Sequence, residues 1–189
     1  MIEIRWHGRG GQGAVTAAEL LASAAIMEGK WAQAFPSFGA ERRGAPVQAY
    51  TRIDDKPIYD RSFIYEPDVV VVLDQSLLEG DEAHNVMSGL KPNGKLIVNT
   101  NQEPREIAKK LGYKGEIVVV DATSIAIELI GRPIVNTAML GAVVKAVKVV
   151  ELTSILKVLE KRFSKSMVDR NAKAIMSAFE KAVVGVVEG

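Results

Sequence analysis

The apolar residues of this chain follow two spacings, and each spacing predicts a different kind of element. At the start, Ile2, Ile4 and Trp6 lie on one side of a two-residue repeat, which is typical of a strand. From Val15 to Ile26 the apolar residues recur every three or four positions, which predicts a helix. The chain therefore begins with a strand followed by a helix.

Further along, continuous β-branched runs alternate with helical patterns. The runs are typical of strands covered on both faces, and they lie at residues 68–74, 95–99 and 116–121. Helical patterns follow at residues 105–111 and 124–130, and over part of residues 76–90. This alternation predicts one domain, residues 1–189, with a Rossmann-like open, mostly parallel α/β sheet and helices on both faces.

Two regions depart from this alternation. Residues 46–53 alternate apolar and polar side chains, and the polar turn after them predicts a β-hairpin insertion whose return strand is residues 57–59. From Asn136 onward, three apolar stripes predict only helices, with Asn136 and Ser166 as N-caps. We therefore expect a helical C-terminus whose apolar stripes belong to the core.

A glycine-rich turn, here called the glycine loop (residues 8–13), joins the first strand to the first helix. Its glycines at positions 8, 10 and 13 fit the pattern G-x-G-x-x-G. Glycine lets a ligand approach the backbone, and the free N–H groups of a first helical turn attract anions. The alternative is a tight turn that binds no ligand. The predicted anion site consists of Gly8, Arg9, Gly10, Gly11, Gln12 and Gly13.

The acidic residue that usually accompanies this pattern is missing. A dinucleotide-binding fold carries an Asp or Glu at the end of its second strand to hold the ribose hydroxyls. Here the second predicted strand, residues 30–35, runs into Pro36, and the next acidic residue is Glu41. This argues against NAD, but it leaves room for another phosphate-bearing ligand.

A second stretch, residues 35–46, here called the arginine loop, joins two predicted strands. Glycines and prolines surround Glu41, Arg42 and Arg43, so special backbone geometry and positive charge coincide. Arginine suits planar, bidentate contact with phosphate or carboxylate. These three residues are therefore further candidates for cofactor binding. The alternative is a solvated turn whose arginines pair with Glu41.

Polar residues also follow three of the predicted parallel strands. Asp74, Asn99 and Asp121 should emerge, with the glycine loop, at the carboxyl edge of the sheet, where open α/β sheets bind their ligands. Alternatively, each acidic residue caps the helix that follows it. His7 adjoins the glycine loop and either faces a ligand or has a structural role. No catalytic triad is recognisable.

Composition narrows the possible functions. The 24 Lys and Arg against 23 Asp and Glu give a net charge of +1, so no overall field indicates nucleic acid or membrane as a partner. With no cysteine and two histidines, a thiolate-bound metal or cysteine-ligated iron–sulfur cluster is excluded and a histidine-rich metal site is not expected. No stretch is typical of a membrane span or signal peptide, so we expect a cytoplasmic protein.

Several motifs occur in an order that is known from one family. They are residues 8–13, Gly-Arg-Gly-Gly-Gln-Gly, and residues 38–46, Phe-Gly-Ala-Glu-Arg-Arg-Gly-Ala-Pro, followed by matches at residues 53–58, 65–68 and 136–141. With these motifs the chain resembles the gamma subunits of the 2-oxoacid:ferredoxin oxidoreductases, above all those of the pyruvate:ferredoxin oxidoreductase (pyruvate synthase) type. The resemblance covers most of the chain.

The resemblance implies an accessory α/β subunit, inactive alone, in an enzyme that converts a 2-oxoacid, coenzyme A and oxidised ferredoxin to an acyl-CoA, CO₂ and reduced ferredoxin. It implies alpha, beta and delta partner subunits that hold thiamine diphosphate and the iron–sulfur clusters. It also places this chain near the entry route of coenzyme A, whose phosphates we expect at the glycine and arginine loops. The same loops could instead dock partner subunits.

Part of the second motif also bears on which 2-oxoacid is the substrate. Arg43-Gly44-Ala45-Pro46 is more similar to pyruvate or branched-chain enzymes than to the 2-oxoglutarate type, so pyruvate ranks before 2-oxoisovalerate. Two hypotheses in which the chain acts without partner subunits also stay open at this point. One is a stand-alone NAD(P)-dependent oxidoreductase, and the other is a non-catalytic nucleotide-binding module.

Overall fold

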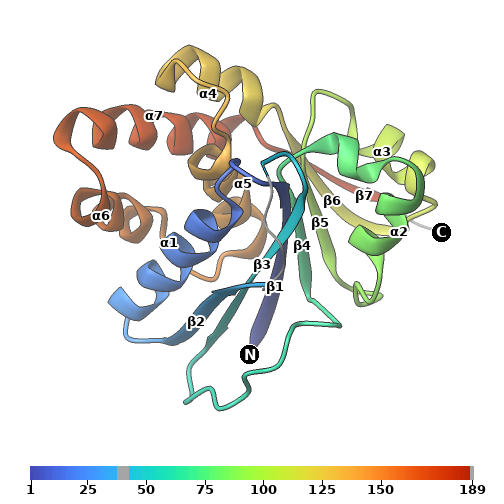
Figure 1. Ribbon diagram of the computed structural model, residues 1–189, viewed down its shortest axis with the longest axis horizontal. Helices are drawn as coiled ribbons and strands as arrows, with labels where there is room; N and C mark the ends of the chain where they lie inside the picture. Colours follow the sequence, from blue (N-terminus) through green and yellow to red (C-terminus); the bar gives the residue numbers. More distant parts are fainter. Residues whose placement is uncertain (38–42, 188–189) are drawn as a thin grey trace.

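The computed structural model describes residues 1–37 and 43–187, and within them seven strands form one open sheet in the order β2-β3-β1-β4-β5-β6-β7 (Figure 1). The bounds of these strands are β1 Ile2–Arg9, β2 Trp31–Pro36, β3 Pro46–Asp54, β4 Val69–Val72, β5 Lys95–Asn99, β6 Gly115–Val120 and β7 Val183–Val187. Strands β1, β4, β5 and β6 are parallel, whereas β2, β3 and β7 add antiparallel pairs at the two sides. The predicted α/β class is confirmed.

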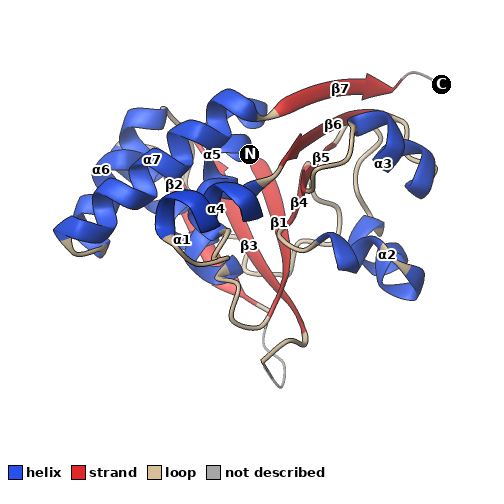
Figure 2. Ribbon diagram, turned by 90° about the horizontal axis from the view of Figure 1, so that it is seen from above, coloured by secondary structure: helices blue, strands red, loops and turns tan. Residues whose placement is uncertain are grey.

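Helices cover both faces of the sheet (Figure 2). One face carries α1 Ala14–Met27, α4 Ala122–Ile130, α5 Asn136–Val147, α6 Leu152–Arg162 and α7 Lys165–Lys181, and the other carries the short 3-10 helix η1 Gln75–Leu78, α2 Gly80–Met87 and α3 Pro104–Leu111. The residues of β4 alternate between the two apolar cores, one on each face of the sheet. Val69 and Val71 face the larger helical layer, and Val70 and Val72 face the smaller one.

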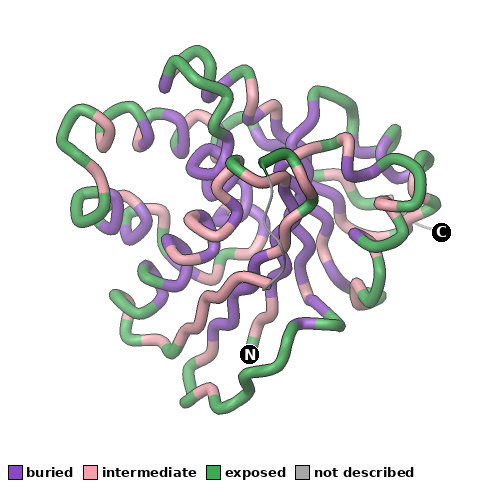
Figure 3. Tube along the Cα trace, in the orientation of Figure 1, coloured by how far each residue is buried: buried purple, intermediate pink, exposed green. Residues whose placement is uncertain are grey.

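The larger core is centred on α5, which is buried along most of its length (Figure 3). It approaches α7 so closely that a Cβ on Gly141 would meet the carbonyl oxygen of Ile175. The hydroxyl of Thr137 also donates a hydrogen bond of 2.6 Å to the Asn171 side chain on α7. Residues 136–141, which carry part of the family resemblance, therefore hold the helical layer together.

Three local predictions are wrong. Residues 57–59 form no return strand, because the antiparallel partners of β3 are β1 and β2. The C-terminal part is not only helical, since β7 follows α7 and pairs with β6. Finally, the N-cap positions are Val135 and Ser164 instead of Asn136 and Ser166.

None of the helices in the described ranges combines the length and apolarity that a membrane crossing requires. The remaining predictions of elements hold to within a few residues. The predicted strand at residues 95–99 has the observed bounds of β5, and the helix predicted at 105–111 is α3, which ends at Gly112 in a left-handed conformation with φ of 61°.

Candidate functional site

The glycine loop and the described end of the arginine loop are hydrogen-bonded to each other. The N–H of Gly10 donates to the carbonyl of Ala45 at 2.8 Å, and the N–H of Gly44 donates to the carbonyl of Gly10 at 3.2 Å. Gly10 and Arg43 also form an isolated parallel bridge. The sheet explains this contact, because β1 and β3 are antiparallel neighbours and β1 therefore ends where β3 begins.

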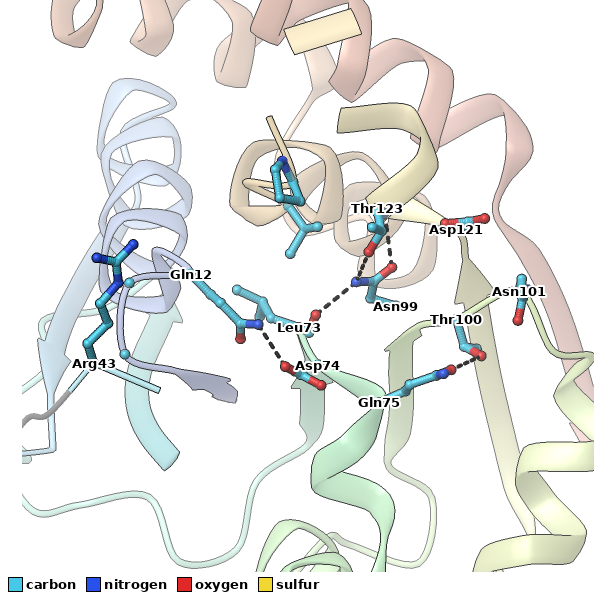
Figure 4. Close-up of a pocket in the computed structure, with 14 residues that line it drawn as sticks. Gln12, Arg43, Leu73, Asp74, Gln75, Asn99, Thr100, Asn101, Asp121 and Thr123 are labelled. Atoms are coloured by element: carbon cyan, nitrogen blue, oxygen red, sulfur yellow. Dashed lines mark hydrogen bonds between the residues drawn. The ribbon is translucent and has the colours of Figure 1, made fainter. Parts of the chain in front are cut away.

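A cleft of about 580 Å³ lies beside this contact, at the carboxyl ends of the central strands (Figure 4). The strand order reverses at β1. The chain continues from β1 through α1 to β2, which lies on one side of β1 beyond β3, whereas β4 lies on the other side. Such a reversal is where open α/β sheets bind ligands. The lining residues are Gly10, Gly11, Gln12, Arg43, Leu73, Asp74, Gln75, Asn99, Thr100, Asn101, Asp121, Thr123, Pro133 and Val135.

Within the glycine loop, the glycines serve different purposes. Gly11 lines the cleft with φ of 93°, and a Cβ there would meet no other atom within 4 Å. Gly13 is the N-cap of α1 with φ of 83°, and a Cβ there would lie 2.4 Å from Nδ2 of Asn136. Gly8 belongs to β1, and a Cβ there would be 3.3 Å from Oε1 of Gln12. Only Gly10 and Gly11 among these glycines line the cleft.

The guanidinium of Arg9, which was predicted as an anion ligand, contacts several other groups of the protein, Asp74 among them. It forms an ion pair with Glu82 at 3.2 Å and donates to the hydroxyl of Ser76 at 2.9 Å and to the carbonyl of Gly44 at 3.3 Å. Arg9 is not among the residues that line the cleft. Its contacts instead tie the glycine loop to the arginine loop and to α2.

Gln12 and Asp74 join the two sides of the cleft. The Gln12 side chain accepts a hydrogen bond of 2.6 Å from the N–H of Arg9 and donates one of 2.8 Å to Asp74 (Figure 4). Burial acts to raise the pKa of Asp74, but hydrogen bonds from Ser76 and Gln12 and the charge of Arg9 outweigh it and lower the pKa. Asp74 is therefore ionised at neutral pH, with its charge partly neutralised by its neighbours.

The predicted convergence of Asp74, Asn99 and Asp121 is confirmed, since all three line the cleft. The alternative prediction also holds for the acidic residues. Asp74 accepts from the N–H of Ser76 at 3.0 Å, and Asp121 accepts from the N–H of Ser124 at 2.9 Å, so both cap the helices that follow. The Asn99 amide donates to the carbonyl of Leu73 at 2.9 Å and thereby fixes the end of β4.

His7 has a structural role. It is buried on the face of β1 opposite α1, and its Nε2 accepts a hydrogen bond of 2.9 Å from Nε of Arg5. Burial, followed by the neighbouring charge of Arg5, lowers the pKa of His7 to about 3. The imidazole is therefore neutral at physiological pH, and it does not line the cleft.

Four polar lining residues were not identified from the sequence: Gln75, Thr100, Asn101 and Thr123. Thr100 donates to Gln75 at 2.6 Å, and the Asn99 amide donates to Thr123 at 2.9 Å, so these side chains form a hydrogen-bonding floor. Each directly follows or neighbours a residue at a strand end, which is the signal that could have indicated them. No group of three or more His, Asp or Glu in the described parts of the chain could hold a metal.

Two predicted site residues, Glu41 and Arg42, lie outside the described residues.

The strand order bears on the alternative that the chain binds NAD. The acidic residue that holds ribose in a dinucleotide-binding fold ends the strand beside β1. Here β2, which follows α1, is separated from β1 by the antiparallel strand β3. In this protein β1 and β2 are therefore not neighbours, as the two strands that position ribose in a dinucleotide-binding fold are.

Sequence comparison defines the class of protein. Residues 3–181 match the family model described as pyruvate ferredoxin/flavodoxin oxidoreductase, and the chain belongs to this family. Over nearly its whole length it corresponds to the gamma subunit, also called PorC, of these multi-subunit enzymes. It is 58% identical over 185 residues to the common gamma subunit of the pyruvate/ketoisovalerate oxidoreductases of Thermococcus kodakarensis, covering 97% of this chain and 98% of that relative.

Solved structures agree with this assignment. The crystal structure of the pyruvate oxidoreductase subunit PORC from Thermotoga maritima has a TM-score of 0.88 and 44% identity, and the match covers 97% of this chain and 98% of that one. The fold also recurs in the 2-oxoglutarate:ferredoxin oxidoreductase of Magnetococcus marinus, solved with 2-oxoglutarate, coenzyme A and succinyl-CoA. That match has a TM-score of 0.74 at 20% identity and covers 94% of this chain and 30% of that one.

Proposed function

We propose that this gamma subunit binds phosphate groups of coenzyme A in the cleft beside the glycine loop and the arginine loop, within the assembled oxidoreductase. The observation that carries the proposal is the pairing of Gly10 with Arg43 and Ala45. Through it, the backbone of Gly10 and Gly11 and an arginine side chain border one cleft. Backbone N–H groups and a guanidinium are the groups that phosphate prefers in proteins.

The charges along the cleft support a phosphate at the Arg43 end. Arg43 is the one cation among the described lining residues, and Gly11 beside it leaves the backbone open to a ligand. The carboxylate of Asp74 is engaged by Gln12, Ser76 and Arg9, which reduces its repulsion of an anion. The far end of the cleft, with Asn101, Thr123 and Asp121, suits hydroxyl and amide groups of the same carrier.

The partners follow from the family. We propose that alpha, beta and delta subunits hold thiamine diphosphate and the iron–sulfur clusters, that ferredoxin accepts electrons from the complex, and that this chain holds none of these cofactors alone. The Magnetococcus enzyme, which shares the fold, was solved with coenzyme A. The reaction converts pyruvate, coenzyme A and oxidised ferredoxin to acetyl-CoA, CO₂ and reduced ferredoxin.

A second substrate is supported by a specific observation. The Thermococcus relative is a common subunit of pyruvate and ketoisovalerate oxidoreductases. We therefore propose 2-oxoisovalerate as the alternative substrate, taken when this chain joins a different set of partner subunits. Purification through a tag on this chain, with identification of the co-purifying chains and assay with both 2-oxoacids, decides between one assembly and two.

The binding proposal is tested in the assembled enzyme with Arg43→Ala. Loss of a charge-assisted contact of about 1.5–3 kcal/mol should raise the KM for coenzyme A roughly 10-fold to 100-fold and leave the KM for pyruvate unchanged. Arg43→Lys should retain part of the affinity, and Arg105→Ala, an exposed arginine on α3, is the matched control. The variant Arg42→Ala with Arg43→Ala tests the contribution of Arg42. Unchanged coenzyme A affinity and turnover in this double variant would overturn the proposal.

A further inference from the structure

Strand β7 forms one open edge of the sheet. It pairs with β6 on one side, and no strand of the described residues lies on its other side, as Figure 2 shows. Its valines are unusually accessible for apolar side chains, with Val183 and Val184 each 47% exposed and Val186 65% exposed. Unpaired N–H and C=O groups beside exposed apolar side chains make such an edge a template for another strand.

The sequence of β7 is symmetric, and this symmetry indicates which strand could pair with its open edge. It reads Val-Val-Gly-Val-Val, which is the same in both directions about Gly185. Two copies of such a strand that pair antiparallel about a two-fold axis at Gly185 place valine opposite valine at every position except the centre. We propose that β7 pairs in this way with β7 of a second copy of this chain, so that the sheet continues from one subunit into the other.

The two faces of β7 fit this arrangement. Gly185 faces α3, where a Cβ would lie 2.5 Å from Cβ of Pro104, so only glycine fits at the proposed axis. Val184 and Val186 point to the opposite face. In the proposed register, Val184 of one copy lies opposite Val186 of the other, and β-branched side chains in such cross-strand positions stabilise an antiparallel pair.

Charge and the opposite sheet edge favour a second copy as the occupant. Like charges placed opposite each other would oppose self-pairing, but β7 carries no charged residue. The other edge strand, β2, is less suited to pairing because it contains Pro36, which has no N–H to donate. One strand pair buries little area, so we expect a weak dimer for the isolated chain.

Cysteine cross-linking tests the register directly, because the natural chain contains no cysteine. Val184→Cys and Val186→Cys chains are mixed and oxidised. Residues opposite each other in an antiparallel pair are within disulfide reach, whereas identical positions displaced by two residues are not. We therefore expect a covalent dimer in the mixture and little in either variant alone. Ile127→Cys, on α4 and 54% exposed, is the matched control that should not cross-link.

Charge pairing gives an independent measurement. Val184→Lys with Val186→Lys, and Val184→Glu with Val186→Glu, should each be monomeric by light scattering at concentrations where the natural chain dimerises, and a mixture of the two should form heterodimers. The same cross-link is expected between gamma subunits in the assembled enzyme. A natural chain that stays monomeric, mixed cysteine variants that form no covalent dimer, or a β7 cysteine that links to a different subunit would overturn the proposal.

Discussion

The side-chain amide of Gln12 donates a hydrogen bond of 2.8 Å to the carboxylate of Asp74, across the cleft from the glycine loop to the end of β4. Its oxygen accepts from the N–H of Arg9 at the same time. One side chain thus fixes both the shape of the loop and its distance from the neighbouring strand.

Gln12→Ala should destabilise the fold by about 1–3 kcal/mol, because it leaves the part-buried N–H of Arg9 without its acceptor and removes one hydrogen bond to the Asp74 carboxylate. Urea unfolding at pH 7 measures the change. Gln102→Ala is the control, since the exposed Gln102 side chain lies outside this network and its loss should change the free energy of unfolding by less than about 0.5 kcal/mol. Equal effects of the two substitutions would contradict the prediction.

Gly13→Ala and Gly11→Ala should differ although both glycines have positive φ. At Gly11 the added methyl group meets open space, so only backbone strain of about 1–2 kcal/mol is expected. At Gly13 the methyl group also collides with Asn136, which adds about 1–3 kcal/mol. Chemical unfolding of both variants measures the difference, and a Gly13 variant no less stable than the Gly11 variant would refute it.

His7 should make stability depend on pH. Its pKa is about 3 in the folded protein and about 6.5 in the unfolded chain, so between these values only the unfolded chain binds the proton. The contribution is therefore complete above pH 6.5 and is lost at about 1.4 kcal/mol per pH unit as the pH falls below 6.5.

The measurement is the free energy of unfolding from pH 7.5 to 4.5. His7→Gln should flatten this dependence, whereas His84→Gln, at the exposed histidine on α2, should leave the contribution of His7 in place. An unchanged slope in His7→Gln would show that the imidazole is not held in its neutral form.

Substitutions of Arg9 and Arg43 should have different effects, the first on the stability of the fold and the second on the affinity for coenzyme A. Arg9→Ala removes contacts to Glu82, Ser76 and Gly44, so unfolding should become easier by about 1–2 kcal/mol. Arg43→Ala should change the free energy of unfolding by less than about 0.5 kcal/mol while it weakens coenzyme A binding. Thermal unfolding and coenzyme A kinetics on the same preparations test this division, which fails if Arg43→Ala destabilises the fold as much as Arg9→Ala.

Sequence periodicity predicted the elements that depend on local pattern. The buried strand β5 and the helix α3 are local in this sense, because an apolar run or stripe between turn residues defines each of them. The convergence of Asp74, Asn99 and Asp121 was also predictable, since carboxyl ends of parallel strands share one edge. This inference requires only that the three strands run parallel in one sheet.

The wrong predictions about β3 and β7 involve partners that are distant in sequence. Val183 fitted the helical stripe of α7, and only pairing with Val119 on β6 makes it part of a strand. The ion pair of Arg9 with Glu82 on α2 could not be predicted from the sequence either, because the two residues are far apart along the chain. Likewise, β3 could not be placed from its turn alone, because its long-range partner β1 determines where it lies.

The pairing of Gly10 with Arg43 has a consequence for divergence among related subunits. It fixes the end of the arginine loop to the scaffold through backbone groups, which every amino acid possesses. Substitutions or insertions between residues 37 and 43 would therefore alter what the loop presents while its attachment to β1 persists. Selection can therefore change the residues of this loop without altering the hydrogen bonds that attach its end to β1.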